Sequence, residues 1–297
     1  MTNFITPLFT PAPSNVAGKQ NSGAYLRNPQ DLLHSRIKPD PNHCRMKLAM
    51  NQPYFFPYLG FYQLIHAVDQ FVIYDSFNYI KSGWVNRNRL LVVGGGPAYF
   101  TVPTVHGSSF KKIRDIKLSA HRNWRRKLLD TFVMNYKRCP FFAETHALIE
   151  AIIGAETDSL SDLATRSIVD VCTHLEINTR LITNPVYDEL ESGLQRDSLR
   201  ETFPAVKLQN PSKGCVRLIA VCQMLGATEF VNAIGGQTLY CKSDFQANGI
   251  DLHFLRSRDE PYQQTTRQYH AGLSIVDVLM NCGKEGTIKR LSNYDLV

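Results

Sequence analysis

The sequence lacks the features that would place the chain in a membrane or outside the cell. Its best apolar candidate, residues 90–105, is broken by Gly94-Gly95-Gly96-Pro97, whereas a membrane helix needs about 18 continuous apolar residues. No basic residue precedes Lys19 and no apolar signal core is found near the amino terminus, so secretion is not expected. The seven cysteines are scattered and never spaced as C-x-x-C, which predicts a reduced, cytoplasmic protein.

Motifs of the common catalytic and metal-binding classes are also missing. The sequence contains no H-E-x-x-H, G-x-S-x-G or D-x-D, and its nine histidines have no metal-ligand spacing, so no metal site is predicted. The triple glycine at 94–96 is not followed by Lys-Ser/Thr or by a helix. This glycine run therefore predicts a hairpin turn rather than a phosphate-binding loop.

The charges are unevenly distributed along a chain whose net charge is +7. Residues 81–138 hold thirteen Lys or Arg against two acids, whereas residues 139–210 hold five against twelve. This polarity favours a small anionic ligand near the first region over DNA binding. The alternative is a basic face that is simply solvated.

The residue pattern predicts an α/β fold after an amino-terminal extension. Residues 1–45 are rich in proline and small polar residues, so they are expected to be disordered or loosely attached, and a single domain is expected over 46–297. Apolar runs at 46–50 and 71–74 flank a helical pattern that starts at Pro57, which predicts a parallel strand–helix–strand unit. Together these features predict a Rossmann-like, three-layer sheet.

Further elements follow from the same periodicities. A β-hairpin is expected from 84–93 and 98–105, a mainly helical insertion at about 120–175, and a surface loop at about 190–214. Later strands are expected at 178–183, 229–233 and 252–255, with helices at 216–225 and 274–282 that end at Gly226 and Gly283. Asp277 follows Ser274 by three residues, which predicts a capping box.

Polar residues at the expected carboxyl ends of strands point to a binding site, because ligands of such sheets bind at that edge. Gln52 and Asp75 follow the first two strands, and Asn232 lies at the end of a later one. Gly235 and Gly236 come next and would allow a ligand to approach the backbone, although a tight turn explains them equally well. Asp75 is the candidate general base. The alternative is that Asp75 caps a turn.

Residues 51–90 combine many aromatic rings with cations and amides. Arg87 and Arg89 project from the same side of an extended segment, so with Lys81 they are predicted to clamp an anion such as a diphosphate. Tyr54 and Trp84 are candidates for stacking on a base or sugar ring, with Asn86 and Asn88 as positioning groups. The alternatives are rings that belong to the core and cations that lie on the surface of a hairpin.

Three strings carry a family resemblance: QPYFFPYLGFYQLI with DQFVIYD and KSGWVNRNR (52–89), RLIAVCQMLGATEFVNAIGGQTLY (217–240) and LSIVDVLMNCG (273–283). They resemble the WbqC-like family, whose members occur in O-antigen and other surface-polysaccharide gene clusters. The resemblance covers about residues 46–297 and implies transfer of glycine or a similar acyl group onto an amino sugar. In this chain Ser76 stands where the family usually has a second acid after the second strand.

A looser likeness concerns the start of the domain. The strand, turn, helix and second strand are similar to the beginning of nucleotidyltransferases with a Rossmann-like fold. The paired histidines of those enzymes are missing, and Tyr58 and Phe61 occupy the corresponding region.

The sequence therefore predicts a transferase of surface-polysaccharide synthesis that moves an acyl or aminoacyl group onto an amino sugar carried on an anionic nucleotide. Asp75 and Lys81 are its predicted catalytic residues. ATP, an acyl-CoA and an aminoacyl-tRNA are the candidate donors, with no cofactor assigned. The alternatives are a glycosyltransferase or nucleotidyltransferase-like enzyme and a non-catalytic sugar- or nucleotide-binding module. No DNA partner or membrane span is expected, and the oligomeric state is left open.

Overall fold

A six-stranded sheet forms the centre of the molecule. The computed structural model describes residues 45–121, 123–183, 213–258 and 260–297. Its sheet has the order β10-β9-β8-β1-β2-β7, in which only β10 is antiparallel. The strands are β1 (Lys47–Asn51), β2 (Gln70–Ile73), β7 (Arg180–Thr183), β8 (Glu229–Ala233), β9 (Asp251–Ser257) and β10 (Tyr294–Leu296). The predicted α/β, Rossmann-like architecture is confirmed.

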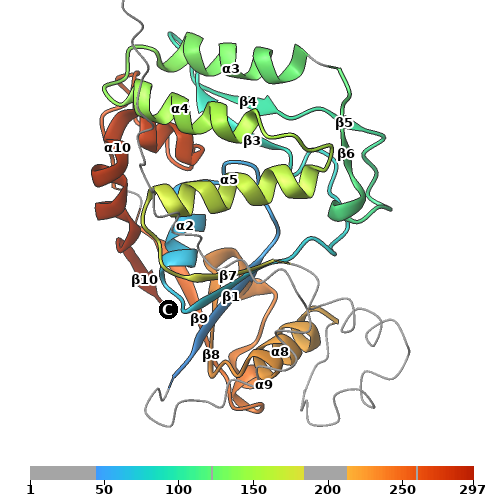
Figure 1. The fold of residues 1–297 in the computed structure, drawn as a ribbon. Coiled ribbons are helices and arrows are strands. Elements are labelled where there is room, and N and C mark those ends of the chain that lie inside the picture. The colour runs from blue at the N-terminus through green and yellow to red at the C-terminus, as the bar shows by residue number, and fades with distance from the viewer. Residues whose placement is uncertain (1–44, 122, 184–212, 259) are drawn as a thin grey trace, which may run out of the picture.

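Alternating side chains of the strands divide the core into two parts. Ala49 belongs to one buried cluster, whereas its neighbours Leu48 and Met50 belong to the other. The first cluster also contains residues of α2 (Leu59–His66), α5 (Leu160–His174) and α10 (Ile275–Leu291), and the second contains residues of α8 (Lys213–Leu225) and α9 (Lys242–Gln246). Helices therefore cover both faces of the sheet, which gives three layers (Figure 1).

The chain between β2 and α5 forms an extra layer above the first helical face (Figure 1). It contains the predicted hairpin, which pairs β3 (Arg87–Leu91) with β4 (Pro97–Thr101), and a shorter pair, β5 (Thr104–Val105) and β6 (Lys117–Leu118), separated by the turn η1 (Ile113–Asp115). Helices α3 (Asn123–Tyr136), α4 (Phe142–Ile153) and α5 then follow, where the helical insertion is expected. Gly94 has a φ of 72° in the hairpin turn.

Two local predictions are wrong, and a third is only partly right. Helix α2 begins at Leu59, with Tyr58 as its extended N-cap, so Pro57 is not a helical residue. The helix that was predicted to stop at Gly283 does break there, with φ 66° and ψ −175°, but a second helical segment follows this kink and α10 continues to Leu291. Asp277 completes no capping box, because Ser274 Oγ accepts from the Val276 N–H and the Asp277 carboxylate is bonded elsewhere.

Two predicted segments lie largely outside the described residues: the amino-terminal extension (1–45) and the surface loop (190–214). The helix prediction that ends at Gly226 is confirmed, since α8 stops at Leu225 and Gly226 has a φ of 69°. Among the helices of the described ranges, none is both long and apolar enough to cross a membrane.

Candidate functional site

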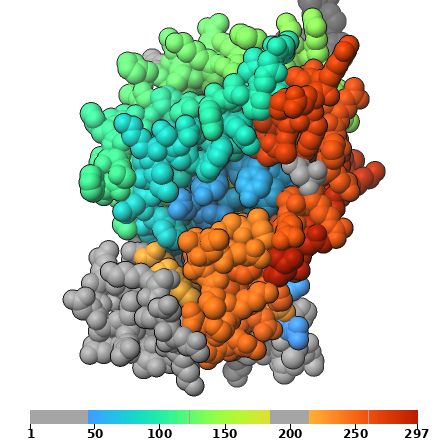
Figure 2. Space-filling model, turned by 180° about the vertical axis from the view of Figure 1, so that it is seen from behind, coloured from blue at the N-terminus to red at the C-terminus, as the bar shows by residue number. Residues whose placement is uncertain are grey.

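A depression lies at the carboxyl edge of the sheet. In Figure 2 the blue segment that follows β1 is visible at the bottom of this depression, between the cyan hairpin region, the orange region after β8 and the red-orange loop before α10. A cavity of about 250 Å³ here is lined by Tyr54, Tyr58, Trp84, Asn88, Arg89 and Gly272. We call this cavity the aromatic crevice. Four of its six residues are predicted site residues: Tyr54, Trp84, Asn88 and Arg89.

The loop between β1 and α2 brings two tyrosines into the aromatic crevice. This loop is fixed at Phe56, which has a φ of 45°, a strained value for a bulky residue. The Phe56 carbonyl accepts hydrogen bonds from Asn88 Nδ2 and Ser274 Oγ, both at 2.8 Å. Partial burial raises the pKa of the Tyr54 and Tyr58 phenols, so both remain protonated donors at neutral pH.

A ladder of rings and guanidinium groups runs along the β3–β4 hairpin. Arg87 Cζ lies 4.4 Å from the centre of the Tyr99 ring, and Arg89 Cζ lies 5.9 Å from the centre of the Trp84 ring. The two rings are 6.0 Å apart and remain 55% and 42% exposed for Tyr99 and Trp84. These aromatic faces are thus placed to stack on a flat group, and cation–π contacts keep the arginines beside them.

Arg89 is anchored by the loop that precedes α10. Its Nη2 donates to the carbonyl of Gly272 at 2.8 Å and to that of Ala271 at 3.4 Å. Arg89 Nε is buried and has no hydrogen-bond partner among the described residues, and a guanidinium group carries five N–H donors. The anchored cation therefore retains donor capacity for an anion.

The two predicted asparagines, Asn86 just before β3 and Asn88 within it, differ in what they do. Asn86 is buried and accepts from the Tyr79 hydroxyl at 2.8 Å while donating to the Val102 carbonyl at 2.9 Å. It does not line the aromatic crevice, so its visible contribution is to the hairpin. Asn88 lines the crevice, but its amide also joins β3 to the loop after β1 through Phe56.

Two amide side chains lie at the carboxyl edge of the sheet, where the neighbouring strands β1 and β8 end. Asn51 Oδ1 at the end of β1 accepts from the Gln52 N–H, and Asn232 Oδ1 near the end of β8 accepts from the Ala233 N–H, both at 2.8 Å. Because β1 and β8 are parallel neighbours, these two amides lie at the same edge. Sequence analysis did not select Asn51 as a site residue. Its position as the last residue of β1 is the feature that could have identified it.

The remaining predicted residues at this edge differ in their surroundings. Gln52 is half-buried in the loop that follows β1. Gly235 is exposed in the turn η2 (Ile234–Thr238), and a Cβ there would have open space around it. Gly236 is buried, and a Cβ there would lie 2.5 Å from Asn232 Nδ2. Gly236 therefore makes room for the Asn232 side chain.

The predicted catalytic residues do not line the aromatic crevice. Asp75 lines a different cavity of about 650 Å³ beside α5. Its Oδ1 accepts from Arg114 Nε at 3.1 Å, and its Oδ2 accepts from Ser161 Oγ at 2.7 Å. Lys81 is exposed in the turn before β3. The structure thus separates the predicted base from the residues that line the aromatic crevice.

Ser76 is part of the same contact as Asp75. It is buried, and its hydroxyl accepts a hydrogen bond from Arg114 Nη2. Arg114 therefore binds a carboxylate and a hydroxyl at the end of β2. A second acid at position 76 would give this arginine two carboxylates instead, so the substitution changes the charge balance of the contact.

Comparisons with known proteins place these residues in context. The sequence model of the WbqC-like protein family matches residues 52–289. The uncharacterized protein Rv1507c of Mycobacterium tuberculosis is 28% identical over 242 residues, which cover 80% of this chain and 95% of that protein. No solved structure matches the chain significantly. The family match over residues 52–289 includes all the residues that line the aromatic crevice.

Proposed function

Because the chain belongs to the WbqC-like protein family, we propose that it is a transferase that acts on an amino sugar carried on an anionic nucleotide. The observation that carries this proposal is the ladder of Arg87, Tyr99, Trp84 and Arg89 beside the carboxyl edge of a parallel sheet. Ligands of Rossmann-like sheets bind at that edge. Family membership supports surface-polysaccharide synthesis as the setting of the reaction, and a cytoplasmic location is part of the proposal.

The aromatic crevice and the neighbouring ring of Tyr99 together match the two halves of such a substrate. The exposed rings of Trp84 and Tyr99 suit a nucleobase or a sugar ring, and Arg89 suits a phosphate group. Tyr54 and Tyr58 are protonated phenols that can donate to sugar hydroxyls. The crevice of about 250 Å³ is small, so we expect it to hold one part of the substrate while the Asn51 and Asn232 amides contact another.

The proposed reaction is acyl or aminoacyl transfer. The sugar amine attacks the carbonyl carbon of an activated donor, a C–N bond forms, the bond to the leaving group breaks, and the amine loses a proton. Orientation and charge stabilisation would supply most of the rate gain. Asp75 and Lys81 stay the predicted catalytic residues. The contacts of Asp75 with Arg114 and Ser161 favour a positioning role over proton transfer.

A binding module is the second candidate. The six residues that line the aromatic crevice include no carboxylate, thiol or imidazole, which is what a non-catalytic sugar- or nucleotide-binding site would show.

Replacing Asp75 by Asn separates the two possible roles of this residue, general base and structural contact. Lost turnover with intact binding identifies a base, whereas loss of both identifies a structural role.

The experiment combines ligand binding with turnover. The full chain is screened by thermal shift with UDP-glucosamine, UDP, ATP and acetyl-CoA, since a ligand of the folded state raises its stability. Any pair of donor and acceptor that binds is then assayed by mass spectrometry. We expect Arg89→Gln and Trp84→Ala each to weaken nucleotide-sugar binding by about tenfold or more, because each removes a charge-assisted bond or a stacking face.

The matched controls are Arg126→Gln and Phe110→Ala, whose side chains are exposed and away from the aromatic crevice. They should bind as the parent does. Equal binding by Arg89→Gln and the parent would contradict the site assignment. If the ligand binds and no donor gives turnover, the binding module replaces the transferase.

A further inference from the structure

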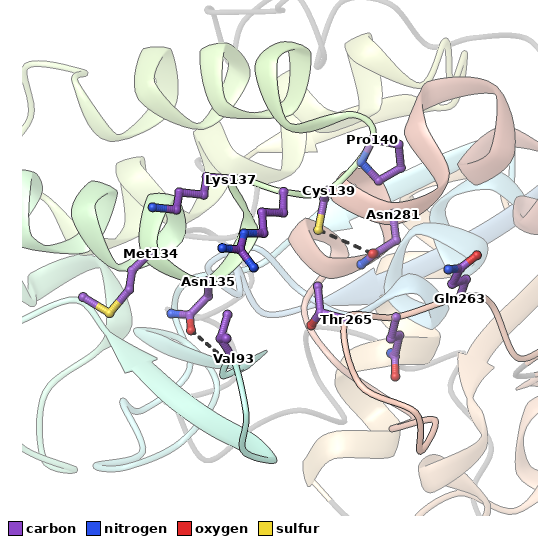
Figure 3. Close-up of a pocket in the computed structure, with 11 residues that line it drawn as sticks. Val93, Met134, Asn135, Lys137, Cys139, Pro140, Gln263, Thr265 and Asn281 are labelled. Carbon is purple, nitrogen blue, oxygen red and sulfur yellow. Dashed lines mark hydrogen bonds between the residues drawn. The ribbon is translucent and has the colours of Figure 1, made fainter.

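A third cavity, of about 550 Å³, lies between the end of α3, the helix α10 and the loop that precedes α10. Figure 3 shows Asn135 and Lys137 on the α3 side of this cavity, with Thr265 and Asn281 across from them. None of its lining residues also lines the aromatic crevice. Its volume is within the range of about 300–1,000 Å³ that is typical of small-molecule sites. We call it the amide cavity.

The carboxamides of this cavity are held in fixed orientations. Asn135 Oδ1 accepts from the Val93 N–H at 3.1 Å, and its Nδ2 donates to the Thr131 carbonyl at 2.8 Å. Asn281 Nδ2 donates to the Asp277 carbonyl at 2.8 Å. A carboxamide has two N–H donors and two acceptor lone pairs, so each of these groups keeps hydrogen-bonding capacity after its structural bonds are made. Oriented amides of this kind suit hydroxyl groups.

Two cations line the same cavity. Lys137 and Arg138 follow the last turn of α3 and are both exposed. Within the part of the chain that the structure describes, neither cation has an ion-pair partner. The carboxylate of Asp277 lies behind the cavity wall, where donors from Tyr262 and Gln264 already satisfy it. The cavity lining itself thus contains two positive charges and no acid.

We propose that the amide cavity binds a small, hydroxyl-rich anion: a sugar-like molecule that carries a phosphate or a carboxylate. Lys137 and Arg138 bind the charged group, while Asn135, Asn281 and Thr265 bind hydroxyls. Charge-assisted bonds from the cations supply affinity, and the fixed amides supply selectivity for a polyol over a bare anion. This site is separate from the aromatic crevice and does not depend on the function proposed for it.

Isothermal titration of the full chain with glucose 6-phosphate, glucuronate, glucose and inorganic phosphate tests the proposal. At least one of the two anionic sugars should bind more tightly than glucose and than phosphate. Lys137→Gln and Arg138→Gln should each weaken that binding by about tenfold, as expected for loss of a charge-assisted bond. A preference between glucose 6-phosphate and glucuronate identifies the charged group.

Matched variants keep the test specific. Lys127→Gln and Arg126→Gln change exposed cations on the same helix outside the cavity and should bind as the parent does. Arg89→Gln should also bind normally, which distinguishes this site from the aromatic crevice. The proposal is overturned if neither anionic sugar binds at about 10 mM. It is also overturned if the Lys137→Gln, Arg138→Gln double variant binds like the parent, or if phosphate binds as tightly as the sugars.

Discussion

The most enclosed acid in the described residues is Asp277, and its contacts explain its burial. Its carboxylate is fully buried and accepts hydrogen bonds from the hydroxyls of Tyr136 and Tyr262, at 2.9 and 2.7 Å, and from Gln264 Nε2 at 3.1 Å. Burial raises the pKa of Asp277, and these bonds partly oppose the rise. A single residue thus joins α3, α10 and the loop before α10.

This raised pKa predicts a defined dependence of stability on pH. The folded protein retains the Asp277 proton to a higher pH than the unfolded chain, whose ordinary value is 3.8. The stability of the parent relative to Asp277→Asn should therefore be highest in acid. It should fall as pH rises above 3.8, by at most about 1.4 kcal/mol per pH unit, and level off above the raised pKa. Urea unfolding of both proteins from pH 3.5 to 8 measures this difference in the free energy of unfolding.

Asp130→Asn serves as the control, because that carboxylate is 66% exposed on α3. Its stability relative to the parent should change little over the same range. A difference between the parent and Asp277→Asn that stays constant, or that grows as pH rises, would contradict the expected sign.

At the scale of elements, the kink in α10 depends on one glycine. Gly283 has φ 66° and ψ −175°, a region of backbone space that is essentially restricted to glycine. A Cβ at this position would lie 2.5 Å from the Phe141 ring. Gly283→Ala should therefore lower the free energy of unfolding by about 2–4 kcal/mol, from backbone strain and displacement of the ring. Urea denaturation gives the value.

Gly95→Ala is the matched change, since a Cβ at Gly95 meets no atom closer than 3.7 Å and its φ is not positive. It should alter the free energy of unfolding by less than about 0.5–1 kcal/mol. If Gly283→Ala has the same free energy of unfolding as the parent, the kink in α10 does not require glycine at this position.

Gly283 also shows how far the sequence can predict this fold. A glycine in the left-handed region ends many helices, so Gly226 and Gly283 carry the same local signal. The helix stops at Gly226 but resumes after Gly283, because Thr287 and Leu291 are buried beyond the kink. Strands were predictable from short apolar runs, whereas the continuation of α10 depends on tertiary packing.

The aromatic crevice and its surroundings were likewise only partly predictable from the sequence. Tyr54, Trp84 and Arg89 lie within 36 positions of one another, so their clustering was visible in the sequence. Gly272, whose carbonyl fixes Arg89, is 183 positions from it. The ring of Tyr99 comes from the opposite strand of the hairpin, directly across from Arg89. Contacts of this kind have no local signal, which is why sequence analysis missed both residues.

At the scale of the whole molecule, a chain of contacts connects the amide cavity to the aromatic crevice. Gln264 lines the former, accepts from the His270 N–H at 2.8 Å and donates to the His270 carbonyl at 3.0 Å. Two residues later Gly272 lines the aromatic crevice, and the Ser274 N–H donates to the Arg89 carbonyl at 2.9 Å. The loop before α10 is therefore held at both ends.

Gln264→Ala should loosen the wall of the aromatic crevice although Gln264 does not line it. Removal of this amide frees the His270 backbone and takes one donor from Asp277. We expect the Ser274 amide to exchange its hydrogen roughly tenfold faster, equivalent to about 1.4 kcal/mol of lost local stability. Hydrogen exchange measures this without any ligand, and Gln263→Ala, which changes an exposed neighbour, should leave the rate unchanged. Faster exchange at His270 with an unchanged rate at Ser274 would show instead that the contacts of Ser274 with β3 and Phe56 hold the crevice wall independently of the amide cavity.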